Sequence, residues 1–238
     1  MKDRFDIVIV GAGITGLTLA ALLAESRYRE RLSLTLIDAA PRPLYRDDDD
    51  IALRVSAIAG GSVSLLDRIG AWSFVSNTLV CPYDQMRVWD ESCPVDSSAT
   101  LRFDAAEFAV AQLGFIVENV LLQHAVLEVL NATDVDLMFS TAISSLRRHD
   151  AQHRLELDSG QELAADLVIG ADGVQSFVRE SVGIGTHDWP YGQSAFVTHL
   201  RPEEPHRNTA WQRFCLLYTS PSPRDCNEYL VCRLLLEK

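Results

Sequence analysis

The chain has 238 residues, of which 47% are hydrophobic, and it carries a formal net charge of -12. This length and composition allow a substantial buried core, so we expect a globular protein of one large or two small domains. Surfaces that bind nucleic acid need clustered Lys and Arg, and the acidic balance therefore excludes a nucleic-acid partner.

The first forty residues begin with a predicted strand, a glycine-rich turn and a helix. Residues 5–10 are a continuous apolar run, which is typical of a strand covered on both faces, and residues 17–25 form the helix. The turn between them reads GAGITG. In this turn Gly11 allows a tight bend, Gly13 lets the backbone approach a pyrophosphate, and Gly16 brings the helix close to the strand.

A second predicted strand, at residues 32–37, ends in Asp38, where this fingerprint places an acid for a ribose hydroxyl. The strand, turn, helix and terminal acid together predict a dinucleotide site. A glycine turn that only packs is the alternative. The fingerprint does not separate NAD from FAD.

A polar loop is expected at residues 39–53. Its four consecutive acids, Asp47–Asp50, lack the spacing of a calcium loop, so we expect a solvated segment and no metal. Arg54 follows in an apolar, small-residue setting. Its guanidinium could face solvent or pair with a pyrophosphate, since its planar fork suits two oxygens. Spacing alone leaves both open.

The chain between Asp134 and Gly170 predicts further strands of the scaffold. They are expected at residues 134–140, 142–149, 154–158, 161–164 and 167–170. The last strand delivers Asp172 and Gly173 to the carboxyl edge of the sheet, where ligands collect. Judged from the residues alone, a Gly-Asp-Gly turn that merely closes a strand is favoured.

Seven segments occur in the order found in flavin-dependent aromatic hydroxylases. They read GAGITGLTLA, LRVSAIAGGSVSLLDRIGAW, MRVWDE, FDAAE, LGFIVEN, VIGADGVQSFVR and WQRF. Within that family the chain resembles the branch that hydroxylates polyprenylated phenol or quinol rings in ubiquinone biosynthesis. The resemblance implies an α/β fold with a Rossmann-like FAD-binding domain and an interleaved, incomplete substrate-binding sheet. The FAD-binding domain is expected at residues 1–76 and 100–183, and the sheet at 77–99 and 184–214, with strands near 86–89 and 192–200.

The resemblance gives both glycine turns a role. Gly11, Gly13 and Gly16 would hold the ADP part of FAD, with Asp38 at the ribose. Asp172 and Gly173 match the Asp-Gly motif that serves both FAD and NAD(P)H, which reverses the preference for a merely structural turn.

Other implied positions lie outside these turns. Arg54 matches an arginine near the FAD pyrophosphate. Glu118, expected at the start of a helix, matches a flavin-lining position. Gln123 lies one turn later, where related proteins vary, and is also a candidate cofactor-binding residue. Glu118 and Asn119 could equally cap that helix without any ligand. No catalytic side chain is identified and no metal is expected, because the cofactor carries the difficult chemistry.

The function implied by the resemblance is hydroxylation of an aromatic ring by an FAD-dependent monooxygenase that uses NAD(P)H and O2. The substrate would be a small polyprenylated aromatic molecule. A cytoplasmic protein is expected, with peripheral association at the inner membrane and a complex with other ubiquinone-pathway enzymes left open. Two other functions also stay open: a non-catalytic dinucleotide-binding fragment and an NAD-dependent dehydrogenase.

The last residues, 215–238, depart from the family pattern. CLLYTSPSPRD resembles a string that arises when sequencing-adapter DNA is translated. We therefore expect an aberrant tail on a truncated copy that binds flavin poorly and hydroxylates nothing, with a short divergent C-terminus as the alternative. Three of the five cysteines fall in this tail, and the five show neither CxxC pairs nor zinc spacing, which indicates reduced thiols.

Overall fold

The computed structural model describes residues 3–26, 29–46, 48–78, 80–189, 197–199, 203 and 205–214. The chain divides into two compact units, and each is described by itself. The first comprises Met1–Asp49, Leu65–Phe74 and Asn119–His187, and the second comprises Asp50–Ser64, Val75–Glu118 and Asp188–Lys238. The domain boundaries expected from the resemblance stay a prediction. The predicted tail, residues 215–238, lies outside the described residues.

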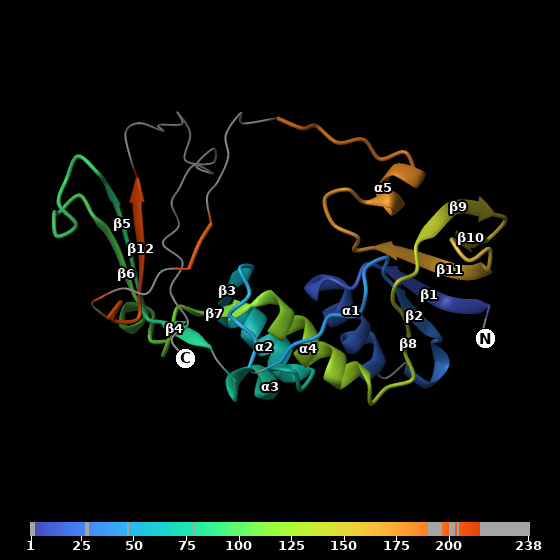
Figure 1. Cartoon of the computed structure of the whole chain (residues 1–238), viewed down its shortest axis with the longest axis horizontal. Helices are drawn as coiled ribbons and strands as arrows, with labels where there is room; N and C mark the ends of the chain where they lie inside the picture. Colours follow the sequence, from blue (N-terminus) through green and yellow to red (C-terminus); the bar gives the residue numbers. More distant parts are fainter. Residues whose placement is uncertain are drawn as a thin grey trace. The chain divides into compact units, whose positions relative to one another are not determined.

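The first unit is built on a six-stranded mixed sheet with strand order β8-β2-β1-β11-β10-β9 (Figure 1). The strands are β1 (Arg4–Val10), β2 (Leu34–Ile37), β8 (Asp136–Met138), β9 (Ile143–His149), β10 (Gln152–Leu157) and β11 (Glu162–Gly170). Strands β8, β2, β1 and β11 run parallel, and β10 and β9 continue the sheet antiparallel. The expected α/β fold with a Rossmann-like arrangement is confirmed.

Helices complete the first unit. Helix α1 (Ile14–Glu25) packs against α4 (Asn119–Leu130), and α5 (Phe177–Ser181) packs on β11 and β9. The short 3-10 helix η1 (Arg29–Arg31) precedes β2. Fully buried aliphatic side chains from α1, α4 and the central strands form the apolar core, which includes Leu17, Leu121, Ile9 and Leu36. Burial of such side chains is the main force that holds the helices on the sheet.

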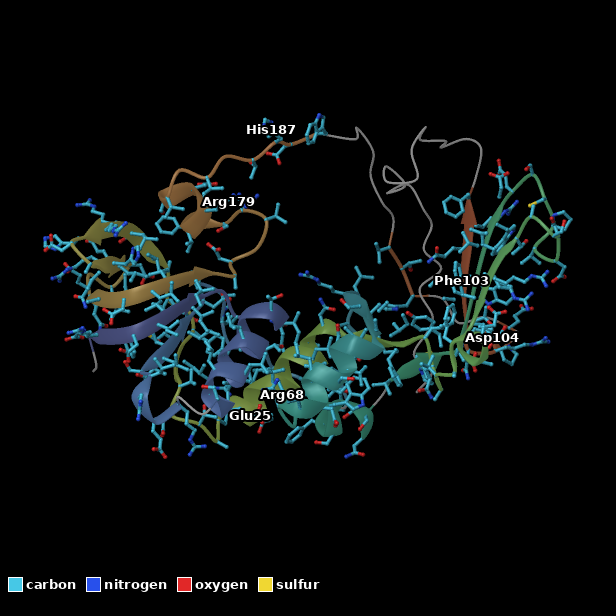
Figure 2. The ribbon with its side chains drawn as sticks, turned by 180° about the vertical axis from the view of Figure 1, so that it is seen from behind. Glu25, Arg68, Phe103, Asp104, Arg179 and His187 are labelled. Carbon is cyan, nitrogen blue, oxygen red and sulfur yellow. The ribbon has the colours of Figure 1, made fainter. Side chains whose placement is uncertain are left out.

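One ion pair within this unit joins helix α1 to the last residue of another helix. Arg68, at the end of α2 (Gly60–Arg68), lies 3.7 Å from Glu25 of α1 (Figure 2). Both side chains are largely exposed, so the pair adds little to stability.

Strand β11 corrects one sequence prediction. Separate strands were expected at residues 161–164 and 167–170, but the strand is continuous from Glu162 to Gly170. Its first half pairs antiparallel with β10 and most of its length pairs parallel with β1. The polar residue in its middle, Asp166, is accommodated because its carboxylate accepts from Gln152 at 2.7 Å and lies 3.7 Å from Arg4.

The second unit contains two three-stranded sheets, with orders β3-β7-β4 and β12-β5-β6. Their strands are β3 (Val55–Ala59), β4 (Cys81–Tyr83), β5 (Gln85–Asp90), β6 (Leu101–Asp104), β7 (Gly114–Glu118) and β12 (Thr209–Phe214). Helix α3 (Trp72–Ser76), whose first three residues belong to the first unit, and the 3-10 helix η2 (Ala105–Phe108) complete the described elements. The strand predicted at residues 86–89 corresponds to β5, whereas most of the one predicted at 192–200 lies outside the described residues.

One sheet of this unit carries an aromatic pair and a cation–π contact. The rings of Trp89 and Trp211 meet edge to face with their centroids 6.1 Å apart. The guanidinium of Arg87 lies 5.5 Å from the centre of the Trp211 ring. These contacts join β5 to β12 through dispersion and cation–π attraction.

Three properties concern the whole described part of the chain. No helix there combines the length and apolar character needed to cross a membrane. Nor does any group of three or more His, Cys, Asp or Glu side chains in these ranges form a candidate metal site. Cys81 and Cys93 form no disulfide with each other, and the other three cysteines fall outside the described residues.

Candidate cofactor-binding site

The first glycine turn is too tight to accept side chains at two of its positions. Gly11 has a φ of +107°, and a Cβ there would lie 2.3 Å from the carbonyl oxygen of Ala171. A Cβ on Gly16 would lie 1.9 Å from the carbonyl oxygen of Gly11. Both glycines are therefore required by backbone packing, as the fingerprint expects.

Gly13 differs from the other two glycines because it faces open space. It is the N-cap of α1, with φ -64° and ψ 169°, and a Cβ there would meet nothing within 4 Å. No side chain caps this end of α1. The first N–H groups of a helix have no partner inside the helix and favour an anion. The exposed turn at Gly13 thus fits the pyrophosphate of a dinucleotide.

Asp38 connects the end of β2 to this turn. One carboxylate oxygen accepts the N–H of Ala12, and the other accepts the N–H of Ala40 at 2.7 Å. A carboxylate offers about four acceptor positions. The half-buried Asp38 can therefore hold the turn and still accept bonds from ribose hydroxyls.

Gln123 reaches the same turn from α4. Its side-chain amide donates to the carbonyl oxygen of Ala12 at 2.9 Å. Ala12, which is 2% exposed, is thus bonded through its N–H to Asp38 and through its C=O to Gln123. The fingerprint specifies only the three glycines of the turn. No sequence signal therefore marked Ala12 as the residue that Asp38 and Gln123 both bind.

The second turn is organised by its own acid. The carboxylate of Asp172 accepts the hydroxyl of Ser176 at 2.5 Å and the N–H of Val178 at 3.1 Å. Ser176 also caps α5 by accepting the N–H of Arg179 at 3.0 Å. Arg179, labelled on α5 in Figure 2, donates through its guanidinium to the carbonyl of Val174 at 2.7 Å. Both oxygens of Asp172 therefore stabilise the turn that contains them.

The two turns meet because their strands are neighbours. The N–H of Ala171 donates to the carbonyl of Val10 at 2.7 Å, and that of Gly11 donates to the carbonyl of Ile37 at 2.8 Å. Strand β1 lies between β2 and β11 in the sheet, so the chain passes from β1 to β2 on one side of β1, and β11 pairs with β1 on the other side. This is the topological switch point at which open α/β sheets bind ligands. Gly173, at φ +82°, lies just beyond it.

Two of the sequence-predicted residues belong to the second unit. Glu118 is 4% exposed and accepts the N–H of Ala52 at 2.7 Å. It was expected to begin a helix, but it is the last residue of β7 and the helix begins at Asn119. Its strand partner is Val55, so the exposed Arg54 lies at the same end of the β3–β7 pair. The buried carboxylate thus fixes the loop that carries Arg54.

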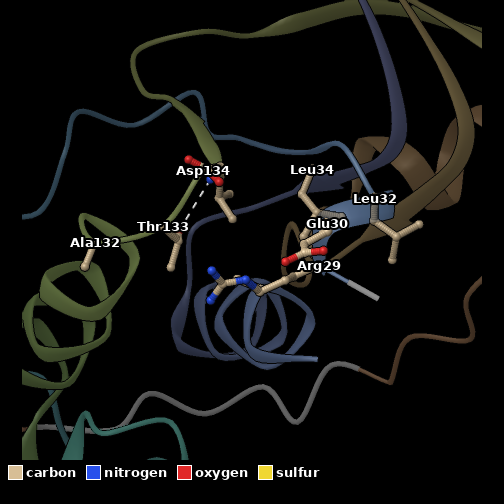
Figure 3. A pocket seen from close by; sticks show the side chains of 9 residues that line it. Arg29, Glu30, Leu32, Leu34, Ala132, Thr133 and Asp134 are labelled. Atoms are coloured by element: carbon tan, nitrogen blue, oxygen red, sulfur yellow. Dashed lines mark hydrogen bonds between the residues drawn. The ribbon is translucent and has the colours of Figure 1, made fainter. Parts of the chain in front are cut away.

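A small pocket occurs elsewhere in the first unit (Figure 3). Its volume is about 280 Å³, and its lining includes Arg29, Glu30, Leu34 and Asp134. Leu34 is the first residue of β2, so the pocket lies at the amino end of that strand, whereas Asp38 follows its carboxyl end. None of the sequence-predicted site residues lines it.

The first unit therefore combines a Rossmann-type sheet with a glycine turn, a helix N-terminus and an acid at one sheet edge, which defines a dinucleotide-binding protein. The chain belongs to the FAD binding domain family, whose pattern matches residues 4–198. The expectation of FAD as the cofactor is confirmed, and membership of this family argues against an NAD-dependent dehydrogenase. The individual site residues stay predictions.

Two curated relatives share substantial identity with the chain. It is 37% identical over 210 residues to 3-demethoxyubiquinol 3-hydroxylase of Escherichia coli K12, covering 88% of this chain and 51% of the relative. It is 33% identical over 225 residues to the mitochondrial ubiquinone biosynthesis monooxygenase COQ6 of Danio rerio, covering 90% of this chain and 46% of the relative. The chain spans about half the length of these relatives.

A solved structure has the same fold. Pseudomonas aeruginosa PqsL, crystallised with 2-aminobenzoylacetate, aligns with a TM-score of 0.63 at 22% identity. The alignment covers 79% of this chain and 48% of PqsL. At this identity the likeness supports the fold and carries no information on the substrate.

Proposed function

We propose that this protein is an FAD-dependent monooxygenase that hydroxylates the aromatic ring of a polyprenylated phenol or quinol in ubiquinone biosynthesis. The observation that carries the proposal is the 37% identity over 210 residues with a 3-demethoxyubiquinol 3-hydroxylase. The glycine turn, Asp38 and the switch point of the first unit support the cofactor part of the proposal.

In this proposal the backbone around Gly11, Gly13 and Gly16 binds the pyrophosphate of FAD, and Asp38 binds the ribose. Bound FAD would supply the oxidation–reduction chemistry that protein side chains lack. Over a full cycle the ring gains one oxygen atom of O2, the other atom leaves as water, and NAD(P)H provides the two electrons. Asp172 and Gly173 shape the sheet edge where these molecules would be bound.

Residues of the second unit have a separate proposed role. Arg54 is exposed and would pair with the FAD pyrophosphate through its planar guanidinium. Glu118 would support it by holding the N–H of Ala52, two residues earlier. A polyprenyl substrate would also favour a membrane surface and a complex with other enzymes of the same pathway.

The test begins with titration of the purified chain with FAD and with NAD, followed by flavin absorbance and fluorescence. A chain that binds FAD is then supplied with NAD(P)H, a short-chain demethoxyquinol and isotopically labelled O2. A product that carries one labelled oxygen atom, detected by mass spectrometry, would support the proposal and would show that the activity survives the truncation expected from the sequence. Binding of FAD with no labelled product would favour the non-catalytic fragment, and binding of NAD alone would overturn the proposal.

A further inference from the structure

The sequence of the glycine turn does not by itself fix the direction of the peptide between Ala12 and Gly13. Ala12 lies between Gly11 and Gly13, and glycine allows backbone conformations that other residues rarely adopt. The peptide that joins Ala12 to Gly13 could therefore turn over without moving its neighbours far. Something outside the turn must fix its direction.

The structure supplies that restraint through Gln123. Its amide nitrogen donates to the Ala12 carbonyl at 2.9 Å. Because a peptide is planar and trans, the N–H of Gly13 points away from the carbonyl of Ala12. The bond from α4 thus determines the direction of the Gly13 N–H. Among the described residues, no acceptor is bonded to that N–H.

The preceding peptide is fixed by a different side chain. The N–H of Ala12 donates to Asp38, which itself is bonded to Ala40. Asp38 and Gln123 therefore hold the two polar groups of one residue, and Ala12 is buried while Gly13 is exposed. The exposed residue Gly13 therefore follows two peptides whose directions are each restrained by a side-chain hydrogen bond.

We propose that Gln123 is a positioning residue: it acts through the carbonyl of Ala12 to aim the N–H of Gly13 at the pyrophosphate of the bound dinucleotide. This inference rests on the proposed FAD site. It assigns to Gln123 an effect on the ADP half of the ligand, because the turn that it holds faces the pyrophosphate. A side chain that contacted the flavin half would change the affinity for FAD and leave the affinity for ADP unchanged.

The first experiment measures the dissociation constants of ADP and FAD by calorimetry for the whole chain and for Gln123→Leu. We expect both constants to rise by the same factor, roughly three- to tenfold, because one hydrogen bond of ordinary net strength is lost. The matched control is Gln152→Leu, which removes an amide bond to Asp166 in the same unit. The control should bind both ligands as the wild type does.

The outcomes separate this inference from the proposed function. Weaker FAD binding with unchanged ADP binding would mean that Gln123 contacts the flavin half, and the positioning role would be wrong. Unchanged binding of both ligands would also overturn it. If the wild-type chain binds NAD but neither FAD nor ADP, the proposed function and the positioning role are both wrong.

The second experiment distinguishes aiming from a general effect on folding. In Gln123→Glu an ionised carboxylate would face the Ala12 carbonyl and could not donate, whereas a protonated carboxyl could. We expect its ADP affinity, relative to wild type at the same pH, to recover as the pH falls from about 7 toward about 5. The deficit of Gln123→Leu should stay constant over that range. A constant deficit in both variants would contradict the positioning role.

Discussion

The carbonyl oxygen of Ala171 lies 2.3 Å from the position that a Cβ on Gly11 would occupy. The second turn of the first unit is therefore packed directly against the first, and each restricts the backbone of the other. A Cβ on Gly16 would also lie 3.3 Å from the Cβ of Ala171. One role of the second turn is thus structural, since it closes one side of the first.

Replacement of Gly11 by alanine should destabilise the protein strongly. The new Cβ would clash with backbone atoms of Ala171, and the alanine would have to adopt a φ of +107°, which is strained for a residue with a side chain. The two costs add. We expect a loss of roughly 3 kcal/mol or more in the free energy of unfolding. Gly160→Ala is the control, because Gly160 has φ +81° and open space around it, and should cost about 1 kcal/mol. Urea denaturation measures both losses of unfolding free energy. Equal losses in Gly11→Ala and Gly160→Ala would show that the contact with Ala171 is not tight.

Replacement of Gly13 by alanine should separate binding from stability. The backbone of Gly13 is one that any residue adopts, and no atom lies within 4 Å of a new Cβ. We expect the free energy of unfolding to change by less than about 1 kcal/mol, while the affinity for ADP and FAD falls about tenfold or more because the methyl group occupies ligand space. A variant that binds ADP normally would place the pyrophosphate elsewhere.

The parts of the site that were predictable from the sequence are those set by local spacing. The glycine turn, its helix and Asp38 follow from strand length and helix geometry within forty residues, so the fingerprint identifies them. The bond between Gln123 and Ala12 joins residues 111 positions apart and depends on how α4 packs against α1. No periodicity encodes such a contact.

The fold shows the same limit. The contact between Gly11 and Ala171 exists only because β11 lies beside β1, which is a property of strand order. Separate strands were predicted on either side of Asp166, but β11 continues through it, and its partners Arg4 and Gln152 come from neighbouring strands. Local patterns therefore predicted most of the elements, and tertiary pairing determined where they join.

Substitutions at Asp172 should distinguish an organiser of the turn from a direct ligand. In Asp172→Asn the amide oxygen can still accept the N–H of Val178, and the amide nitrogen can donate to the Ser176 hydroxyl. We expect Asp172→Asn to lose less than about 1 kcal/mol in stability and Asp172→Ala to lose about 1–3 kcal/mol. Thermal or urea unfolding measures both. A large loss of FAD affinity in the asparagine variant at unchanged stability would indicate that the carboxylate contacts the ligand.

Tyr83 gives the second unit a dependence on alkaline pH. It is 7% exposed, and burial raises the pKa of its phenol above the usual value. The unfolded chain would ionise this tyrosine first, near about pH 10, so the stability contribution is complete below that pH and is lost as the pH rises through the folded pKa. Tyr83→Phe keeps the ring and removes the titrating group. We therefore expect the free energy of unfolding, followed by tryptophan fluorescence in urea between about pH 8 and 11, to fall less steeply in the variant than in the wild type. Parallel curves would mean that the phenol ionises equally easily in the folded and unfolded chain, and that its burial has no effect on stability at high pH.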